Sequence, residues 1–174
     1  MLRGINVGGQ KIIRMENLRA SFEALGFRRV RSYVQSGNVI FEATKSSSNN
    51  LPKLIGDKIL IDCGFSAPVV LRTAEEVKQI VAGNPFLNVK GIDRSKLHVT
   101  FLSQLPATAN NGRLDRLDSD PDQFRVRGQE IYLYCPNGYG RSKLSNNATE
   151  KLLGVEATTR NWKTVNVLAE MSSE

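Results

Sequence analysis

The chain has 174 residues, with 24 Lys and Arg against 17 Asp and Glu, one His and two Cys, and its formal net charge is +7. This length allows one large domain or two small ones with a sizeable buried core. Its 40% of apolar residues is the composition of an ordinary globular protein. One His and two Cys exclude a zinc finger, a His/Cys metal cage and a disulfide scaffold. We therefore expect neither a bound metal nor a cofactor.

Membrane and export signals are not expected in this sequence. It contains no uninterrupted apolar stretch of about 18 residues, which a transmembrane helix requires. Residues 1–6 have no long apolar run of the kind that marks a signal peptide. Cys63 and Cys135 lie far apart in the sequence, and in the cytosol such thiols are typically reduced and buried. These observations predict a cytoplasmic protein without a membrane partner.

The positive charge is concentrated near the start of the chain. Residues 1–35 contain seven basic and two acidic residues, a net of +5, whereas the other 139 residues carry +2. A concentrated positive field attracts phosphates, nucleic acid or acidic partners. The alternative interpretation is a solvated face that keeps the protein soluble.

The first half of the chain predicts the element order β-α-β-β-α-β. Leu18, Phe22 and Leu25 recur at helical spacing before Gly26, which favours a helix that ends at this glycine. The sequence Ser36-Gly37-Asn38 separates two strand-like runs, as in a β-hairpin. The remaining predicted elements are strands over 2–7, 28–35, 39–41 and 68–71, a polar loop over 45–50 and a second helix over 51–59.

The second half predicts an initial helix and then strand, helix, hairpin and helix. Thr73 and Glu76 have the spacing of a capping box, which predicts a helix start. The other predicted elements are strands over 97–102, 124–126 and 131–135, a weak helix over 114–117 and helices near 146–153 and 160–171, the last capped by Thr158 or Thr159. This order predicts an α+β fold of two tandem ferredoxin-like (βαββαβ-type) subdomains with antiparallel sheets, residues 1–72 and residues 73–174, the second with an extra C-terminal helix.

The predicted topology brings two polar, glycine-rich segments together. The first and third strands of a ferredoxin-like sheet are adjacent, so residues 6–9 are expected beside residues 35–38. Glycines there let backbone N–H groups approach a ligand closely. The candidate ligand-binding residues of this region are Asn6, Gly8, Gly9, Lys11, Gln35, Ser36 and Asn38. The alternative is that these glycines only make turns.

Two C-terminal segments have the composition of an anion site. Residues 136–143 form a glycine-containing loop with two cations and a hydroxyl before a helix, which suits the capture of phosphate or carboxylate. Residues 157–162 are expected to open the final helix, whose N-terminus favours anions. The candidate ligand-binding residues here are Arg141, Ser142, Lys143, Arg160 and Asn161. The alternative is a loop and a cap that carry surface charges.

Several familiar motifs fail on their spacing. Gln10 stands where a phosphate-binding P-loop needs lysine, and Asn6 replaces the second glycine of a Rossmann fingerprint. The acidic turn at residues 118–122 lacks the glycine and the glutamate that a calcium loop requires. His98 has no Ser or Cys nucleophile motif nearby, so we expect a packed or hydrogen-bonded strand histidine.

Five segments together resemble one protein family. They are LRGINVGG (2–9), YVQSGNVIF (33–41), LHVTFLS (97–103), GRSKL (140–144) and ATTRNW (157–162). In this order, over nearly the whole chain, they are similar to the bacterial domain-of-unknown-function family 1697. The resemblance implies an intact cytosolic bacterial protein with a two-part α+β architecture, and it supplies no catalytic residues. Family members usually have further strand residues before the first segment, so the first strand is expected to be short here.

These observations favour a protein that binds a phosphate-bearing ligand, either a nucleotide-like molecule or a nucleic acid, at a basic, glycine-rich site. One alternative is a metal-independent enzyme that acts on a phosphorylated metabolite with the same polar residues. A second alternative is a protein-interaction module. Tyr132 and Tyr134 share one face of a strand, where they are candidates for stacking on a ring or for filling an interface between subdomains.

Overall fold

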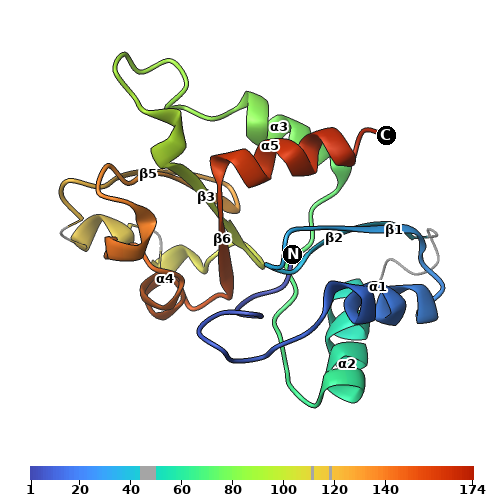
Figure 1. Ribbon diagram of the computed structural model, residues 1–174. Coiled ribbons are helices and arrows are strands. Elements are labelled where there is room, and N and C mark those ends of the chain that lie inside the picture. The colour runs from blue at the N-terminus through green and yellow to red at the C-terminus, as the bar shows by residue number, and fades with distance from the viewer. Residues whose placement is uncertain (44–49, 111, 118) are drawn as a thin grey trace. The chain divides into compact units, whose positions relative to one another are not determined.

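The computed structural model describes residues 1–43, 50–110, 112–117 and 119–174. The protein has a mixed α+β fold with antiparallel sheets, and it divides into two compact units, Met1–Leu71 and Arg72–Glu174 (Figure 1). Each unit has its own sheet and its own buried core. The predicted polar loop over 45–50 lies, except for Asn50, outside the described residues, and so does Asp118 of the acidic turn.

The first unit contains two helices and a two-stranded sheet. In chain order its elements are α1 (Met15–Ala24), β1 (Arg28–Tyr33), β2 (Asn38–Glu42) and α2 (Leu51–Cys63). β1 pairs antiparallel with β2, with Tyr33 opposite Asn38, so the predicted hairpin is confirmed. α1 packs against β1 and α2.

The core of the first unit lies between the apolar faces of its two helices. Leu18 and Phe22 of α1 and Ile55 and Ile59 of α2 are at most 2% exposed. Full burial of such a side chain stabilises a fold by about 1.5–3 kcal/mol. The helical spacing of apolar residues in the sequence therefore located α1 and its buried face, and it also predicted a helix where α2 lies.

The prediction of strands over 2–7 and 68–71 is wrong. Leu2 and Val69 form one isolated bridge instead of a ladder. No ladder forms because the chain leaves the extended region soon after this bridge, at Gly4, whose φ is 69°. The hydrogen-bonded sheet of the first unit thus consists of β1 and β2.

The second unit is built around a four-stranded sheet. Its helices and strands in chain order are α3 (Ala74–Ala82), β3 (Leu97–Leu102), β4 (Gln123–Arg127), β5 (Glu130–Tyr134), α4 (Asn146–Leu153), β6 (Ala157–Asn161) and α5 (Trp162–Met171). Single 3-10 turns lie between them at η2 (Arg94–Lys96), η3 (Thr108–Asn110), η4 (Leu114–Arg116) and η5 (Tyr139–Arg141). Among the described residues, no helix is long and apolar enough to span a membrane.

The sheet has the strand order β4-β5-β3-β6, and every pair is antiparallel. α5 and α3 lie on one face of it, and α4 lies on the other (Figure 1). The connection from β3 to β4 contains 3-10 turns, so the weak helix predicted over 114–117 is reduced to one turn. The tandem ferredoxin-like arrangement stays a prediction, since the first unit pairs only β1 with β2 into a described ladder.

The segment 157–162 does not open the final helix as predicted. Residues Ala157–Asn161 form β6 at the edge of the sheet, with Thr159 opposite Thr100 of β3. The helix cap is Asn161, whose Oδ1 accepts the N–H of Thr164 at 2.8 Å, and neither Thr158 nor Thr159 fills this role. β-branched threonines favour a pleated strand, and this preference decides the segment once β3 is available for pairing.

Tyr132 is not available as an exposed stacking surface. The side chain is 3% exposed, and its hydroxyl donates to the carbonyl O of Ile80 in α3 at 3.1 Å. Burial raises the pKa of Tyr132 to about 12, with a smaller contribution from Glu130. The ring therefore anchors α3 to the sheet.

Candidate functional site

Asn6 ties together two segments of the first unit that are distant in the sequence. Its Nδ2 donates to the carbonyl O of Gln35 at 2.8 Å and of Ile13 at 3.0 Å, and its Oδ1 accepts the Ile13 N–H at 2.8 Å. These bonds use both amide protons and one lone pair. We call these three residues the Asn6 clamp. Asn6 of the segment 6–9 therefore meets Gln35 of the segment 35–38, through a side-chain hydrogen bond and not through the pairing of two strands that was expected.

The backbone around the Asn6 clamp is strained. Asn6, Lys11 and Val34 have φ values of 54°, 47° and 49°, a region that non-glycine residues rarely adopt and that is an outlier for β-branched valine. Each such residue costs on the order of 1–3 kcal/mol and persists where its surroundings over-determine it, as at ligand clamps. The other described non-glycine residue with a positive φ is Arg29 in β1.

Between Asn6 and Lys11 the chain reverses direction in a tight turn. Gln10 N–H donates to Val7 O at 3.0 Å, and Gly8 and Gly9 between them have φ values of 58° and 74°. A Cβ on either glycine would meet nothing within 4 Å, so the backbone is open to approach from outside. We call residues 7–10 the glycine tip. It projects away from α1 and α2 (Figure 1).

Lys11 places a cation next to the glycine tip. Its side chain is exposed, and its Nζ donates to the carbonyl O of Ser66 at 2.6 Å. An ammonium group has three N–H donors. The Ser66 bond therefore holds the charge in position, while the remaining donors can bind an anion at the tip.

The other polar candidates of the first unit serve the hairpin between β1 and β2. Asn38 is 0% exposed, and its Nδ2 donates to Ser36 Oγ at 2.9 Å and to Tyr33 O at 3.2 Å. Gln35 is exposed and gives its carbonyl oxygen to Asn6. Asn38 is thus buried inside the turn, whereas Gly8, Gly9, Lys11 and Gln35 lie at the surface.

In the second unit, Arg141 and Lys143 are exposed at the end of η5. Ser142 lies between them, and its Oγ accepts the N–H of Leu144 at 3.0 Å. Burial raises the pKa of the nearby Cys135 to about 11; the charge of Asp122 acts in the same direction, and the Ser142 hydroxyl has a smaller, opposite effect. Because the thiolate is the reactive form, Cys135 is a buried structural thiol.

Arg160 and Asn161 are used inside the second unit. The guanidinium of Arg160 donates to Thr158 Oγ1 at 2.7 Å and to Thr159 O at 2.8 Å, and the residue is 8% exposed. Burial lowers the pKa of Arg160 to about 10, and nearby Tyr139 acts in the opposite direction. Asn161 caps α5. Both residues therefore have structural roles that the sequence pattern did not reveal.

A polar network fixes η5 and α4 to the sheet. Thr159 Oγ1 donates to Asn146 Oδ1 at 2.7 Å and accepts the hydroxyl of Tyr139 at 2.9 Å. Because Thr159 has only one proton, Thr100 is the donor in its 2.7 Å contact with Thr159. The Tyr139 ring also stacks on His98, with 5.2 Å between centroids and 26° between planes.

His98 is a packed, hydrogen-bonded strand histidine, as predicted. Its Nδ1 lies 3.2 Å from the carbonyl O of Lys96. Burial lowers the pKa of His98 below 6.5 and outweighs two effects that raise it, the Lys96 carbonyl and the charge of Asp122. The Lys96 charge is a further, smaller lowering effect. The neutral imidazole is therefore the form that the fold prefers.

This lowered pKa predicts a pH dependence of stability. The unfolded chain binds a proton at His98 near pH 6.5 and the folded chain binds it only at lower pH, so the His98 contribution is complete above pH 6.5 and is lost as the pH falls through the folded pKa. Relative to His98→Phe, the wild-type Tm is expected to fall between pH 7.5 and pH 5. Parallel Tm profiles of the two proteins, or a wild type that gains on the variant in acid, would contradict this assignment.

Sequence reasoning missed a large pocket in the second unit. It lies along β4 and has a volume of about 960 Å³. Its walls come from segments between Leu105 and Leu153 that no single motif contains. Only alternating apolar residues such as Phe124 and Val126 gave a signal there, and that signal indicates a strand without saying that its edge borders a cavity.

The chain belongs to a protein family. The family model described as "Protein of unknown function (DUF1697)" matches residues 1–132, which include the LRGINVGG and SGNVIF segments of the first unit. The GRSKL and ATTRNW segments lie beyond the matched residues. The chain is thus a member of a family whose function is not established.

A solved structure has the same fold. It is a conserved bacterial protein, SP0830 from Streptococcus pneumoniae, which is 19% identical in sequence and superposes with a TM-score of 0.73 over 99% of this chain and 96% of its own. At this identity the likeness shows the fold alone. No curated protein matches the chain.

Proposed function

We propose that the first unit binds a phosphate-bearing ligand, a nucleotide-like molecule or a nucleic acid, at the glycine tip. The observation that carries this proposal is Lys11, a cation held by Ser66 beside two open glycines on a strained backbone. Backbone N–H groups next to a positioned cation are the donors that phosphate oxygens accept. The strain is the cost expected where a clamp is kept for a ligand.

The surroundings of the tip fit a ligand with a ring as well as a phosphate. Val7, Ile12 and Val34 are 65%, 70% and 50% exposed, and each is the chain neighbour of a residue of the Asn6 clamp. Exposed apolar side chains beside a polar site mark a binding surface. They offer contact area to a nucleobase, which inorganic phosphate would leave unused.

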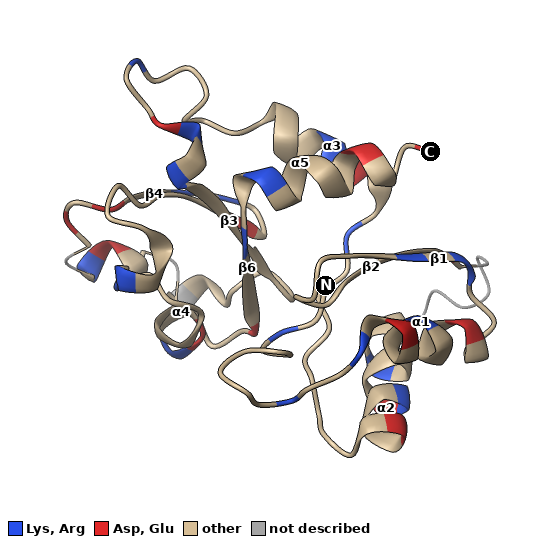
Figure 2. Ribbon diagram, viewed as in Figure 1, with Lys and Arg blue, Asp and Glu red and all other residues tan. Residues whose placement is uncertain are grey.

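The charge of the first unit supports the same class of ligand. It contains ten basic and five acidic residues, and Figure 2 shows basic residues on the segment before α1 and along β1. The ion pair Arg29–Glu42 in this unit, at 3.4 Å, is exposed and contributes about 0–1 kcal/mol. The net positive field remains available to draw an anionic ligand to this unit.

Titration calorimetry with adenosine monophosphate and with a ten-nucleotide single-stranded DNA tests the proposal. Lys11→Gln is expected to weaken binding roughly ten- to hundredfold, because a hydrogen bond to a charged group contributes about 1.5–3 kcal/mol. Lys53→Gln is the matched control. It removes the same charge from an exposed lysine of the same unit, which pairs with Asp57, and it is expected to leave affinity nearly unchanged.

An equal loss of affinity in both variants would mean that overall charge, not the glycine tip, holds the ligand, and would overturn the proposal. Failure of both probes to bind would overturn it as well. The two ligand classes differ in salt dependence. Binding of the oligonucleotide falls with salt in proportion to the phosphates contacted, with a logarithmic slope of about −0.7 per phosphate for single strands, whereas the mononucleotide responds weakly.

A further inference from the structure

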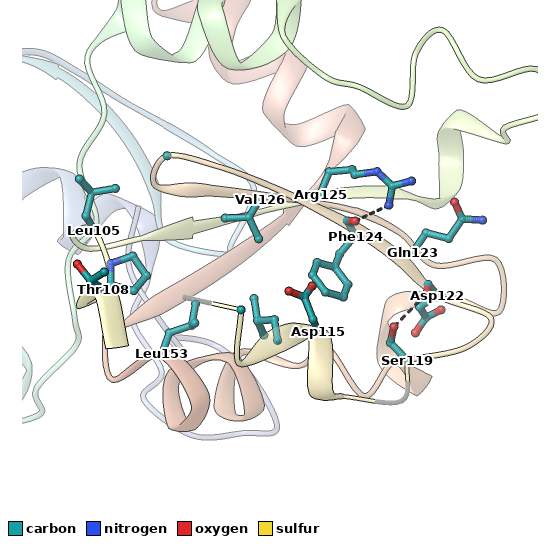
Figure 3. A pocket seen from close by; sticks show the side chains of 14 residues that line it. Leu105, Thr108, Asp115, Ser119, Asp122, Gln123, Phe124, Arg125, Val126 and Leu153 are labelled. Atoms are coloured by element: carbon teal, nitrogen blue, oxygen red, sulfur yellow. Dashed lines mark hydrogen bonds between the residues drawn. The ribbon is translucent and has the colours of Figure 1, made fainter. Parts of the chain in front are cut away.

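The pocket along β4 is a groove with one wall made by a strand. Its volume of about 960 Å³ is in the range of known ligand sites. Figure 3 shows Phe124 and Val126 of β4 on one side of the space, and Leu105, Thr108, Asp115 and Leu153 around the rest of it. The groove lies entirely within the second unit.

β4 is an edge strand. It stands at the end of the order β4-β5-β3-β6, and four of its five residues are exposed. In an antiparallel ladder every second residue directs its backbone N–H and C=O away from its partner. Along the outer side of β4 these groups can pair with a further strand, as in peptide recognition by strand addition.

The groove is apolar where side chains of such a strand would lie. Leu105 and Val126 are 62% and 49% exposed. Leu114 and Leu153 belong to the core beneath the groove and form its floor. An exposed leucine and an exposed valine in a preformed depression are a typical contact surface for an apolar side chain.

The charge at the groove is negative. Asp115 and Asp122 line it. The guanidinium of Arg125, the cation among the lining residues, is directed elsewhere, since it donates to Phe124 O at 2.8 Å and lies 5.7 Å from the centroid of the Phe86 ring. Figure 3 shows this side chain on the opposite side of β4 from the Phe124 ring. Two carboxylates are thus left to select a cationic partner.

We propose that this groove binds an extended peptide that adds as a strand to β4. Every second residue of such a peptide faces the groove, and these residues are apolar and basic: an apolar side chain is buried beside Leu105 and Val126, and basic side chains pair with Asp115 and Asp122. A second copy of the chain is a poorer occupant. Antiparallel pairing of two β4 strands centred on Arg125 would set the two Arg125 residues opposite each other, and like charges in that position destabilise a ladder.

Fluorescence anisotropy with the full chain tests this proposal. The probe is a fluorescein-labelled eight-residue peptide, Ser-Val-Ser-Lys-Ser-Val-Ser-Lys, which places valine and lysine on the same face of a strand, and saturable binding is expected although the protein itself is positively charged. The double variant Asp115→Asn/Asp122→Asn is expected to weaken binding by about tenfold or more, since charge-assisted contacts are lost. The double variant Glu156→Gln/Glu170→Gln removes the same charge from two exposed residues outside the groove and is expected to bind as the wild type does.

Two further peptides separate the alternatives. The same peptide with glutamate in place of lysine, and the lysine peptide N-methylated at alternate residues, are both expected to bind at least tenfold more weakly, because one lacks the cations and the other the strand donors. Equal binding of the N-methylated peptide would mean a side-chain pocket without strand addition, and would overturn the proposal. Equal binding of the acidic peptide, no effect of the two Asp substitutions, or a dimer that excludes the peptide would each overturn it as well.

Discussion

Replacement of Arg72 by methionine is expected to lower the free energy of unfolding of the second unit by about 3–5 kcal/mol, the usual cost of removing one partner of a buried ion pair. Arg72 Nε donates to Glu130 Oε1 at 2.7 Å, and the two side chains are only 5% and 15% exposed. Its Nη2 also donates to the carbonyl oxygens of Leu102 and Gln129, at 2.8 and 3.2 Å. Methionine fills similar space but leaves the Glu130 carboxylate buried without its cation.

Urea unfolding followed by Trp162 fluorescence measures this effect. Trp162 is the only tryptophan and is 8% exposed in α5, so its emission reports on the second unit. The double variant Arg72→Met/Glu130→Leu removes both charges and is expected to recover part of the loss. A single variant within about 1 kcal/mol of the wild type would show that the pair is solvated in solution.

Gly37→Ala is expected to destabilise the first unit by about 2–4 kcal/mol, because it combines backbone strain with overpacking. Gly37 has a φ of 76°, and a Cβ there would lie 2.8 Å from Leu2 Cβ and 2.9 Å from Ile5 Cδ1. Leu2 and Ile5 are 1% and 2% exposed, so neither can move into solvent. The turn between β1 and β2 is thus packed against the start of the chain.

Substitutions at two other glycines separate the effect of backbone strain from that of overpacking. Gly64 has a φ of 74°, and a Cβ added there would meet nothing within 4 Å, so Gly64→Ala carries strain alone, roughly 1 kcal/mol. Gly140 has open space and no positive φ, so its alanine variant is expected to be nearly neutral. Hydrogen exchange of the amides of β1 and β2 measures the Gly37 effect. Equal losses in Gly37→Ala and Gly64→Ala would show that the close contacts relax without cost.

Local signals in the sequence predicted the elements that local physics controls. The spacing of Leu18 and Phe22 located α1, and Thr73 with Glu76 located the start of α3, where both bonds of the capping box are present. The turn at Ser36-Gly37-Asn38 was also predicted correctly. Such helix and turn signals depend on residues within four positions of one another.

Strand assignments failed where pairing partners distant in the sequence decide the outcome. Thr158 and Thr159 were predicted as helix caps, but β3 offers them a free edge, and they become part of β6. Residues 2–7 were predicted as a strand, but positive φ values at Gly4 and Asn6 end the extended backbone after a single bridge. A short window of the sequence shows neither which strand edge is free for pairing nor which residues adopt a positive φ.

The candidate site was predicted as a region, but the roles of its side chains were not. Residue type suggested that Asn6 and Asn38 bind a ligand, whereas their amides bond to backbone and side-chain groups of the same unit. An amide is equally suited to either use, and only the neighbours that the fold supplies decide between them. The bond from Lys11 to Ser66 joins residues 55 positions apart, which no spacing rule predicts.

The proposal that the glycine tip binds phosphate is tested most directly by mapping the contact on the protein. Nitrogen-15 NMR spectra of the full chain, recorded during titration with adenosine monophosphate, report on each backbone amide. We expect saturable shifts at Gly8, Gly9 and Lys11, with smaller shifts at Val34 and Gln35 across the Asn6 clamp, and loss of these shifts in Lys11→Gln. Shifts confined to residues 138–143 of the second unit, or no saturable shift at the tip, would contradict it.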